Sequence, residues 1–271
     1  MRHRGRVRSS PLMSHDMPRA DQLLVQQGLV SSRTAAQRLI EGGRVHWRSA
    51  KGGQVVTRAS QAIPDGCMLE VTPDPDADRY VSRGAWKLHG ALSQTGITVT
   101  DKACLDVGQS TGGFTDCLLQ AGARSVTGID VGHDQLHARL RDDPRVTTIE
   151  GCNARHLDPT VLGATFPEGG FPVIVADVSF ISLTLILGPL TTLLAANGSM
   201  LLLVKPQFEV GREHLGKGGI VRDTTLHGAV EDKLRCCACD AGLRVRAWLD
   251  SPITGGDGNR EFFLWTEHEH I

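Results

Sequence analysis

A glycine-rich stretch, residues 105–116, has the residue types and spacing of a site that binds a nucleoside. An apolar β-type run breaks at Gly108 into a turn, and a helical pattern of apolar residues begins at Phe114. At such a strand–loop–helix junction, bare backbone can approach a ligand and the first N–H groups of the helix point at it. The next strand pattern, residues 126–130, ends in Asp130, which is placed to bind a pair of ribose hydroxyls.

The glycine spacing narrows the kind of nucleotide site. Gly-x-x-x-Gly-Gly replaces the Gly-x-Gly-x-x-Gly of dinucleotide sites, and no Lys-Ser/Thr follows to make a phosphate loop. A third strand pattern, residues 146–150, is followed by Asn153, which either meets an adenine edge or forms a turn. We predict a Rossmann-type site for a nucleoside-containing cofactor; the alternative is a tight turn without a ligand.

Four charged residues lie at the boundaries of predicted elements: Lys87, Asp177, Lys205 and Glu261. Asp177 and Lys205 end the strand patterns 171–177 and 199–204, and ligands of doubly wound sheets bind at these carboxyl ends. Lys87, one helical turn after Arg83, is by itself typical of a solvent-facing helix lysine. Carboxylates beside lysines can hold the amines in place and change how easily they lose a proton.

The elements that must position these residues alternate between strand and helix. Further patterns predict a helix at about 225–241, a strand at 243–250 and a final strand within 259–265. We therefore predict an α/β fold with a parallel-type sheet over residues 80–271. A loop with Gly211, Gly216, Gly218 and Gly219 is expected to be a lid. Residues 178–204 carry no charge, but Gly188-Pro189 and Asn197-Gly198 divide them into loop, helix, turn and strand rather than a membrane span.

A smaller α+β unit precedes this region. Asp16 can cap a helix over 19–27, and Ser31 or Ser32 can cap a second helix over 33–41. A strand beginning at 44, a turn at 51–53 and a strand at 67–71 complete the unit. We expect a disordered basic arm at 1–15, the small domain at 16–72, a proline-and-acid linker at 73–79 and the large domain at 80–271.

Charge is unevenly distributed along the chain. Residues 1–60 hold 11 Lys/Arg against 3 Asp/Glu, whereas the remainder holds 18 against 27. A basic N-terminal region followed by an acidic remainder indicates that the N-terminal region binds nucleic acid. The alternative is that this region is only a solvated basic surface. The seven cysteines match no zinc pattern, and their odd number without an apolar signal region predicts reduced thiols in the cytoplasm.

The small domain resembles the RNA-binding domain named for ribosomal protein S-four. The resemblance rests on Arg19-Ala20-Asp21, Ser32-Arg33-x-x-Ala36, Leu39-Ile40 and Gly43-x-Val45, although Ala20 stands where a leucine is usual. In that family the second helix and the adjoining loop present basic groups to RNA backbone. The resemblance implies that phosphate contacts, which position rather than specify, come from Arg19, Arg33, Arg38 and Arg44.

The large domain resembles FtsJ-type ribose 2′-O-methyltransferases, which use a Lys-Asp-Lys-Glu tetrad. The whole chain is similar to the TlyA family, which joins this domain to the same RNA-binding domain. The sequence motifs that carry the resemblance are Tyr80-Val81-Ser82-Arg83-Gly84, Asp106-Val107-Gly108 through Gly113-Phe114-Thr115-Asp116, Asp177-Val178-Ser179-Phe180-Ile181-Ser182, Lys205-Pro206-Gln207-Phe208-Glu209 and Gly216-Lys217-Gly218-Gly219. It covers about residues 17–266, and departures stand at Ala85-Trp86 and Gln109.

The resemblance implies methyl transfer from S-adenosyl-L-methionine to a ribose 2′-hydroxyl of cytidine in small- or large-subunit ribosomal RNA. The resemblance implies that Lys87, Asp177, Lys205 and Glu261 are the catalytic residues. It also implies that Asp130 binds the ribose hydroxyls of the cofactor and that Asn153 faces its adenine. The residues expected to line the methionine end are Asp106, Gly108, Ser110, Thr111, Gly112 and Gly113. Its expected partners are ribosomal RNA and ribosomal subunits, with no metal and no stable membrane association.

The residues themselves fit this chemistry. A 2′-hydroxyl is a poor nucleophile, so a base must take its proton as the methyl group is attacked. Lys205 can serve if its amine is neutral, and Lys87 as a second cation favours that state, whereas Asp177 and Glu261 oppose it. Two alternatives remain: an RNA-binding assembly factor with an inactive methyltransferase fold, and a membrane-active haemolysin, a label that some members of the family carry.

Overall fold

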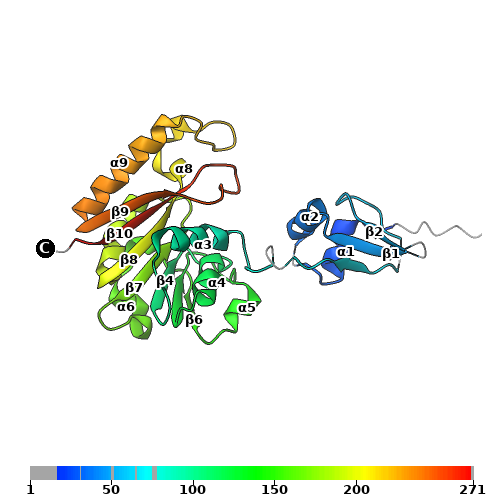
Figure 1. Cartoon of the computed structure of the whole chain (residues 1–271), viewed down its shortest axis with the longest axis horizontal. Coiled ribbons are helices and arrows are strands. Elements are labelled where there is room, and N and C mark those ends of the chain that lie inside the picture. The colour runs from blue at the N-terminus through cyan, green and yellow to red at the C-terminus, as the bar shows by residue number, and fades with distance from the viewer. Residues whose placement is uncertain (1–16, 31, 50–51, 65, 75–77, 270–271) are drawn as a thin grey trace, which may run out of the picture. The chain divides into compact units, whose positions relative to one another are not determined.

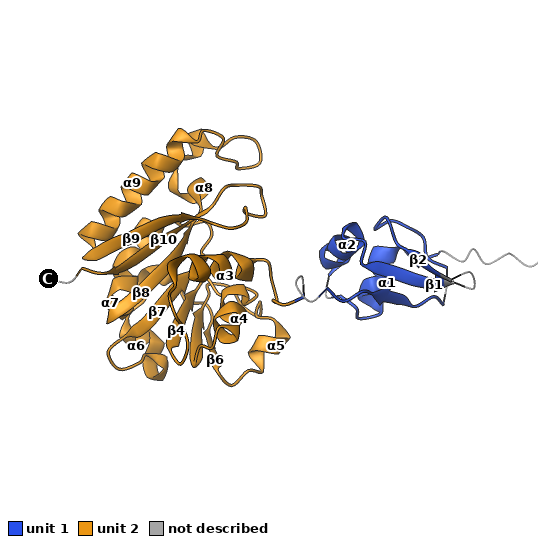
Figure 2. Cartoon of the chain, viewed as in Figure 1, with its two compact units in different colours: residues 1–78 blue, residues 79–271 orange. Residues whose placement is uncertain are grey.

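The chain forms two compact units, residues 1–78 and 79–271 (Figure 2). The computed structural model describes residues 17–30, 32–49, 52–64, 66–74 and 78–269. The basic arm expected at 1–15 and the capping residue Asp16 lie outside the described residues, as do Ser31 and Lys51.

The first unit packs two helices on a small antiparallel sheet. Helices α1 (Ala20–Gln26) and α2 (Arg33–Glu41) precede strands β1 (Val45–Ser49), β2 (Gly52–Val55) and β3 (Leu69–Val71), which lie in the order β2-β1-β3. Helix α2 has the predicted bounds, and the predicted cap is confirmed because Ser32 Oγ accepts a hydrogen bond from Ala35 N at 3.2 Å. Gly52 and Gly53, expected in a turn, instead open β2, where they pair with Ser49 and Arg48.

The second unit is built on a seven-stranded sheet in the order β6-β5-β4-β7-β8-β10-β9 (Figure 1). Strands β4 to β8 run parallel, and β10 is antiparallel to both of its neighbours. The sheet is therefore mixed rather than purely parallel. The reason is local, because no helix separates β9 from β10, and a parallel pair needs a long crossover connection. The strands are β4 (Ala103–Val107), β5 (Ser125–Ile129), β6 (Val146–Ile149), β7 (Phe171–Ala176), β8 (Leu194–Val204), β9 (Leu243–Asp250) and β10 (Phe262–His268).

Helices cover both faces of this sheet, as the period of two along each strand requires. On one face, α3 (Gly84–Thr95) and α4 (Gly113–Gln120) pack their apolar side chains against Val173 and Val175 of β7. On the other, α7 (Leu187–Leu193) and α9 (Thr225–Asp240) pack against Ile174. The shorter helices are α5 (Ala138–Arg141), α6 (Pro159–Leu162) and α8 (Pro206–Glu209).

The uncharged stretch before Lys205 folds as part of this core. It forms α7 and then β8, which begins at Leu194 rather than at the predicted Ser199. The expected turn at 197–198 lies inside β8, where pairing with β7 shifts from Phe171↔Leu194 to Val173↔Ser199. Within the described part of the chain, no helix has both the length and the apolar character needed to cross a membrane.

Candidate active site

A buried ion pair joins the start of α3 to the start of β10. Lys87 Nζ lies 2.6 Å from Glu261 Oε2, and the two side chains are only 11% and 2% exposed. Burial raises the pKa of Glu261, while the hydrogen bond and charge of Lys87 and the charge of Lys205 lower it. The Lys87 ammonium is therefore held in one place by a carboxylate that has little contact with water.

A second, less buried ion pair lies at the ends of two neighbouring parallel strands. Lys205 follows β8 and Asp177 follows β7, so strand pairing brings them to the same edge of the sheet. Lys205 Nζ lies 2.7 Å from Asp177 Oδ1 and donates a hydrogen bond of 2.8 Å to Ser179 Oγ. Their side chains are 12% and 21% exposed, so water and a substrate can reach this pair.

The two pairs form one charged group. The charges of Lys205 and Asp177 both act on Glu261, which is itself bonded to Lys87. The four residues singled out in the sequence are thus brought together from α3, β7, β8 and the segment before β10. Two amines and two carboxyl groups gathered near one edge of the sheet can bind a hydroxyl group and move its proton.

A cavity of about 530 Å³ opens beside Asp177 and runs along the ends of β4 and β5. Five of the predicted residues line it: Gly108, Ser110, Asp130, Asn153 and Asp177. Two backbone hydrogen bonds hold the Asp130 carboxylate in the cavity. Asp130 Oδ2 accepts from Ser110 N at 2.6 Å, and Oδ1 accepts from Gly132 N at 2.7 Å. Asn153 Oδ1 accepts from Arg155 N at 3.0 Å, so this residue forms a turn and also lines the cavity.

The other residues predicted for the cofactor differ in their burial, and none of them lines the cavity. Of the described residues, those lining the cavity do not include Asp106, Thr111, Gly112 or Gly113. Asp106 is fully buried; burial raises its pKa to about 7, although a hydrogen bond from Thr115 opposes the shift. Gly112 and Gly113 form the N-cap and first residue of α4. Asp106, Gly112 and Gly113 are thus buried in the fold, whereas Thr111 is exposed.

Gly108 is required by the close approach of the loop to β7. Its φ is +84°, and a Cβ at this position would lie 2.5 Å from the backbone O of Asp177. A side chain here would therefore push the loop away from the strand end that carries Asp177. This glycine allows the glycine-rich loop and the charged group to share one cavity.

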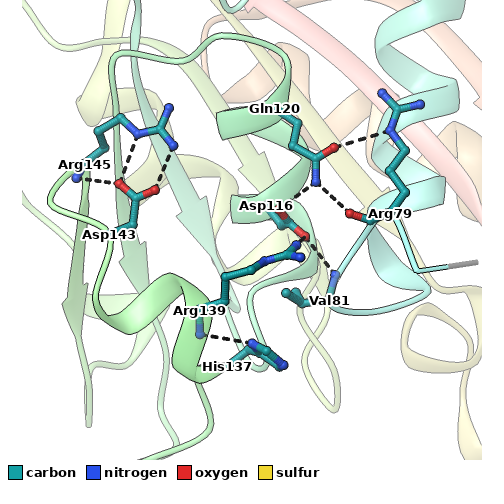
Figure 3. A network of polar contacts seen from close by, with 8 residues as sticks. All are labelled: Arg79, Val81, Asp116, Gln120, His137, Arg139, Asp143 and Arg145. Atoms are coloured by element: carbon teal, nitrogen blue, oxygen red, sulfur yellow. Dashed lines mark hydrogen bonds and ion pairs between the residues drawn. The ribbon is translucent and has the colours of Figure 1, made fainter. Parts of the chain in front are cut away.

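Polar side chains of helix α4 bind neighbouring segments in the network that Figure 3 shows. Asp116 Oδ2 accepts hydrogen bonds from Val81 N at 2.8 Å and from Arg139 of α5 at 2.7 Å. Gln120 donates to Asp116 Oδ1 at 2.9 Å and to the backbone O of Arg79 at 2.8 Å. The first residues of the second unit and α5 are thus tied to the helix that follows the glycine-rich loop.

An exposed aromatic residue beside Asp177 was not predicted as a site residue. Phe180 is 89% exposed, has a φ of +63° and lines the cavity. Its ring centroid lies 5.1 Å from that of Phe208, which follows Lys205 on α8. A non-glycine residue in the left-handed region is uncommon, and at a site it points to function. The sequence gives only its place near Asp177, because neither exposure nor φ can be read from it.

In the first unit, two of the predicted RNA-binding arginines converge on a buried acid. Arg19 Nε and Arg33 Nη2 lie 3.0 and 2.9 Å from the Asp21 carboxylate. The hydrogen bond from Arg19 is the main cause that lowers the pKa of Asp21 to about 2. A cavity of about 560 Å³ is lined by both arginines and by Arg58, which the sequence patterns missed. The β-bridge Arg19↔Ala62 brings the segment after β2 back to this place.

The other two predicted arginines do not line this cavity. Arg44 donates to the backbone O of Thr72 at 3.0 Å and pairs with Asp78 at 2.5 Å, so its guanidinium is used within the fold. Arg38 is exposed on α2 and contacts no acid among the described residues. All seven cysteines are free, and the described residues contain no group of three or more His, Cys, Asp or Glu that could hold a metal.

Comparison with known proteins assigns the two units. Residues 80–268 match the FtsJ-like methyltransferase family, and residues 18–46 match the S4 domain. The 16S/23S rRNA (cytidine-2′-O)-methyltransferase TlyA of Mycobacterium tuberculosis is 41% identical over 91% of this chain and 88% of its own length. Hemolysin A of Brachyspira hyodysenteriae is 39% identical over 90% of this chain and 97% of its own length. A solved structure from Streptococcus thermophilus, which carries a provisional hemolysin name, has a TM-score of 0.70 and 41% identity, covering 93% of this chain and 88% of that one.

The chain belongs to the FtsJ-like methyltransferase family and, within it, to the TlyA group that also carries an S4 domain. The prediction of a methyltransferase with a preceding RNA-binding domain is confirmed by these matches. The α/β fold class is confirmed as well, with β10 as the antiparallel exception.

Proposed function

We propose that this FtsJ-like methyltransferase transfers the methyl group of S-adenosyl-L-methionine to the ribose 2′-hydroxyl of cytidine in ribosomal RNA. The single observation that carries the proposal is the contact of Lys205 with Asp177 and Ser179, which line the same cavity as Asp130. A proton-transfer group and a nucleoside-sized cavity thus share one edge of the sheet. The TlyA relative of Mycobacterium tuberculosis, which is named for this reaction, supports the choice of substrate.

The cavity residues fit the proposed cofactor. Asp130 has both carboxylate oxygens oriented by backbone N–H groups, as a residue that accepts from two ribose hydroxyls requires. Asn153 and the apolar side chains of Ile129 and Val178 offer a polar edge and flat walls for an adenine. When bound, S-adenosyl-L-methionine supplies an electrophilic methyl group, and the sulfur departs neutral.

The charged group supplies the proton transfer. Lys205 takes the proton of the 2′-hydroxyl when its amine is neutral, and Asp177 and Ser179 fix the direction of that amine. Lys87, held in place by Glu261, belongs to the same charged group and adds a second amine at this edge of the sheet. Phe180 offers an exposed aromatic face beside this group, which suits stacking with the base of a single-stranded nucleotide.

The first unit is proposed to bind ribosomal RNA. Arg19 and Arg33 each use part of the guanidinium on Asp21, which orients both, and the remaining N–H groups together with Arg58 face a shared cavity. Oriented guanidinium groups match phosphate oxygens in geometry and charge. These contacts would hold the RNA without reading its sequence.

Mapping of 2′-O-methylation at nucleotide resolution tests the proposal. Ribosomal RNA is compared between cells with and without the protein, and purified subunits from the deficient cells are then treated with protein and S-adenosyl-L-methionine. We expect at least one cytidine to gain a 2′-O-methyl group in both comparisons. An unchanged methylation map, despite binding of the subunits, would favour an assembly factor with an inactive methyltransferase fold.

A further inference from the structure

Gln109 lies in the glycine-rich loop, and its side chain is buried inside the fold. It is only 3% exposed and lies over Gly128 of β5. A Cβ at Gly128 would stand 2.0 Å from the Cδ atom of Gln109, so the glutamine fills the space that this glycine leaves. Gly128 pairs with Asp106 across β5 and β4, which places the amide beside the buried carboxyl.

The backbone holds Gln109 in this position from both sides. The N–H groups of Gly108 and Gln109 both donate to the backbone O of Ile129, at 2.8 and 3.1 Å. The N–H of Gly112 donates to the backbone O of Gln109 at 2.8 Å. These hydrogen bonds fix the backbone of Gln109, so its side chain has little freedom to leave the buried position.

The amide of Gln109 begins a chain of buried hydrogen bonds that ends at Asp106. Gln109 Nε2 donates to Thr115 Oγ1 at 2.9 Å, and Thr115 Oγ1 donates to Asp106 Oδ2 at 2.7 Å. A hydroxyl group has one proton, so a donor on its lone pair leaves that proton for the carboxylate. In a water-free interior such linked bonds strengthen one another. Gln109 thus directs the Thr115 hydroxyl toward Asp106.

The surroundings of Asp106 otherwise oppose its negative charge. Its side chain is fully buried, and burial is the main cause that raises its pKa to about 7. The charged and titratable groups that face it are Asp177, Asp130, Cys104 and Cys117. Both aspartates raise its pKa further. The hydrogen bond from the Thr115 hydroxyl is therefore the main support of the ionised carboxylate, and a hydrogen bond with the backbone of Thr115 adds a smaller one.

We propose that Gln109 is a positioning residue that keeps Asp106 ionised through Thr115 and thereby extends the binding of S-adenosyl-L-methionine to lower pH. The inference rests on the proposed function, because it requires this cofactor in the cavity beside Gly108 and Asp130. A carboxylate directly behind the loop attracts the sulfonium and ammonium cations of the cofactor, and a neutral carboxyl group does not. Cofactor affinity falls as protonation of Asp106 removes this attraction.

The test is the pH profile of cofactor binding to the full chain. The dissociation constant for S-adenosyl-L-methionine is measured by calorimetry between about pH 6 and pH 8.5, a range that brackets the pKa of Asp106. In the parent protein, affinity should fall as the pH drops through about 7. In Gln109→Met, which fills similar space without an amide, the fall should begin about half to one pH unit higher. At the upper end of the range the two proteins should bind within about twofold, because Asp106 is ionised in both.

Two further variants separate this role from packing. Gln94→Met, on the exposed surface of α3, is the matched control and should leave the profile unchanged. Thr115→Val keeps the shape of the side chain but lacks the hydroxyl, and should shift the profile upward as well. Because Gln109 acts through Thr115, adding Gln109→Met to Thr115→Val should shift the profile no further.

Three outcomes would overturn the inference while leaving the proposed function intact. They are an unshifted profile in Gln109→Met, an equal loss of affinity at every pH, or additive shifts in the double variant. If Gln109→Met does not fold, the profile of Thr115→Val decides, and an unshifted profile there overturns the inference. Failure of the parent protein to bind S-adenosyl-L-methionine at any pH would instead contradict the proposed function.

Discussion

Replacing Lys205 with Met removes the amine that contacts Asp177 and Ser179 but keeps an unbranched side chain. Of the residues that the structure describes, the cavity lining includes Asp177 and Ser179 but not Lys205. The change therefore removes a proton-transfer group without removing a wall of the cofactor cavity. Methyl transfer should be lost while cofactor binding is retained.

The size of both effects follows from the geometry of the pair. A positioned general base contributes about 10² to 10⁴ in rate, so kcat should fall by that factor, or about 3 to 5 kcal/mol of barrier. Asp177 is 21% exposed and can be hydrated once the amine is gone. The loss of this partly exposed ion pair should cost about 0 to 1 kcal/mol of stability. Affinity for the cofactor should not decrease, because Asp177 keeps its negative charge.

The assay follows transfer of a labelled methyl group to purified, unmodified ribosomal subunits, with calorimetry of cofactor binding in parallel. Lys233→Met is the matched control, because Lys233 also pairs with a carboxylate, Glu209 at 3.2 Å, but lies on α9 outside the charged group. The control should keep the parent kcat. A kcat for Lys205→Met within about threefold of the parent, with the same nucleotide modified, would refute the role of Lys205 as the base.

Three other changes have defined outcomes. Glu261→Gln leaves the Lys87 ammonium buried without a carboxylate and should reduce the free energy of unfolding by about 3 to 5 kcal/mol in chemical denaturation; a loss below about 1 kcal/mol would contradict the burial of this pair. The pKa of Asp21 is lowered from 3.8 to about 2, so its contribution to stability is complete above 3.8 and is lost as the pH falls toward 2. Asp21→Asn should remove that part of the acid dependence, and unfolding curves that match the parent at every pH would disprove it. Arg58→Gln should weaken ribosomal RNA binding and reduce the slope of log affinity against log salt by about 0.7 to 0.9, whereas Arg124→Gln, an exposed arginine of the second unit, should not.

Elements with strong local signals were predicted close to their observed bounds. Helix α2 has the predicted bounds because Ser32 caps its first turn and a glycine pair follows its last. Strand β9 also has its predicted bounds, since Gly242 ends α9 just before it. The direction of β10 was missed although it has a local signal: no helix lies between β9 and β10, and so short a connection favours an antiparallel pair. The early start of β8 was missed for a different, non-local reason, since Leu194 is in a strand only through its pairing with Phe171.

The candidate site also combines features that the sequence predicts locally with contacts that only the tertiary structure shows. The sequence predicted which residues carry the chemistry from residue type, from position at the end of an element and from the resemblance to FtsJ-type methyltransferases. It placed Lys87, Asp177, Lys205 and Glu261 at such ends, and it placed Asp130 after the glycine-rich loop. The tertiary structure decided which of them contact one another: Lys87 pairs with Glu261, and Lys205 with Asp177.

Only the tertiary structure could also explain Gln109, which has no evident reason in the sequence. Its amide reaches Asp106 through Thr115, and its side chain occupies the space left by Gly128 in the neighbouring strand. Phe180 likewise combines an exposed side chain with a left-handed backbone conformation. In each case the deciding contact joins residues that are distant in sequence or depends on a conformation that local preferences disfavour, so no pattern along the chain could reveal it.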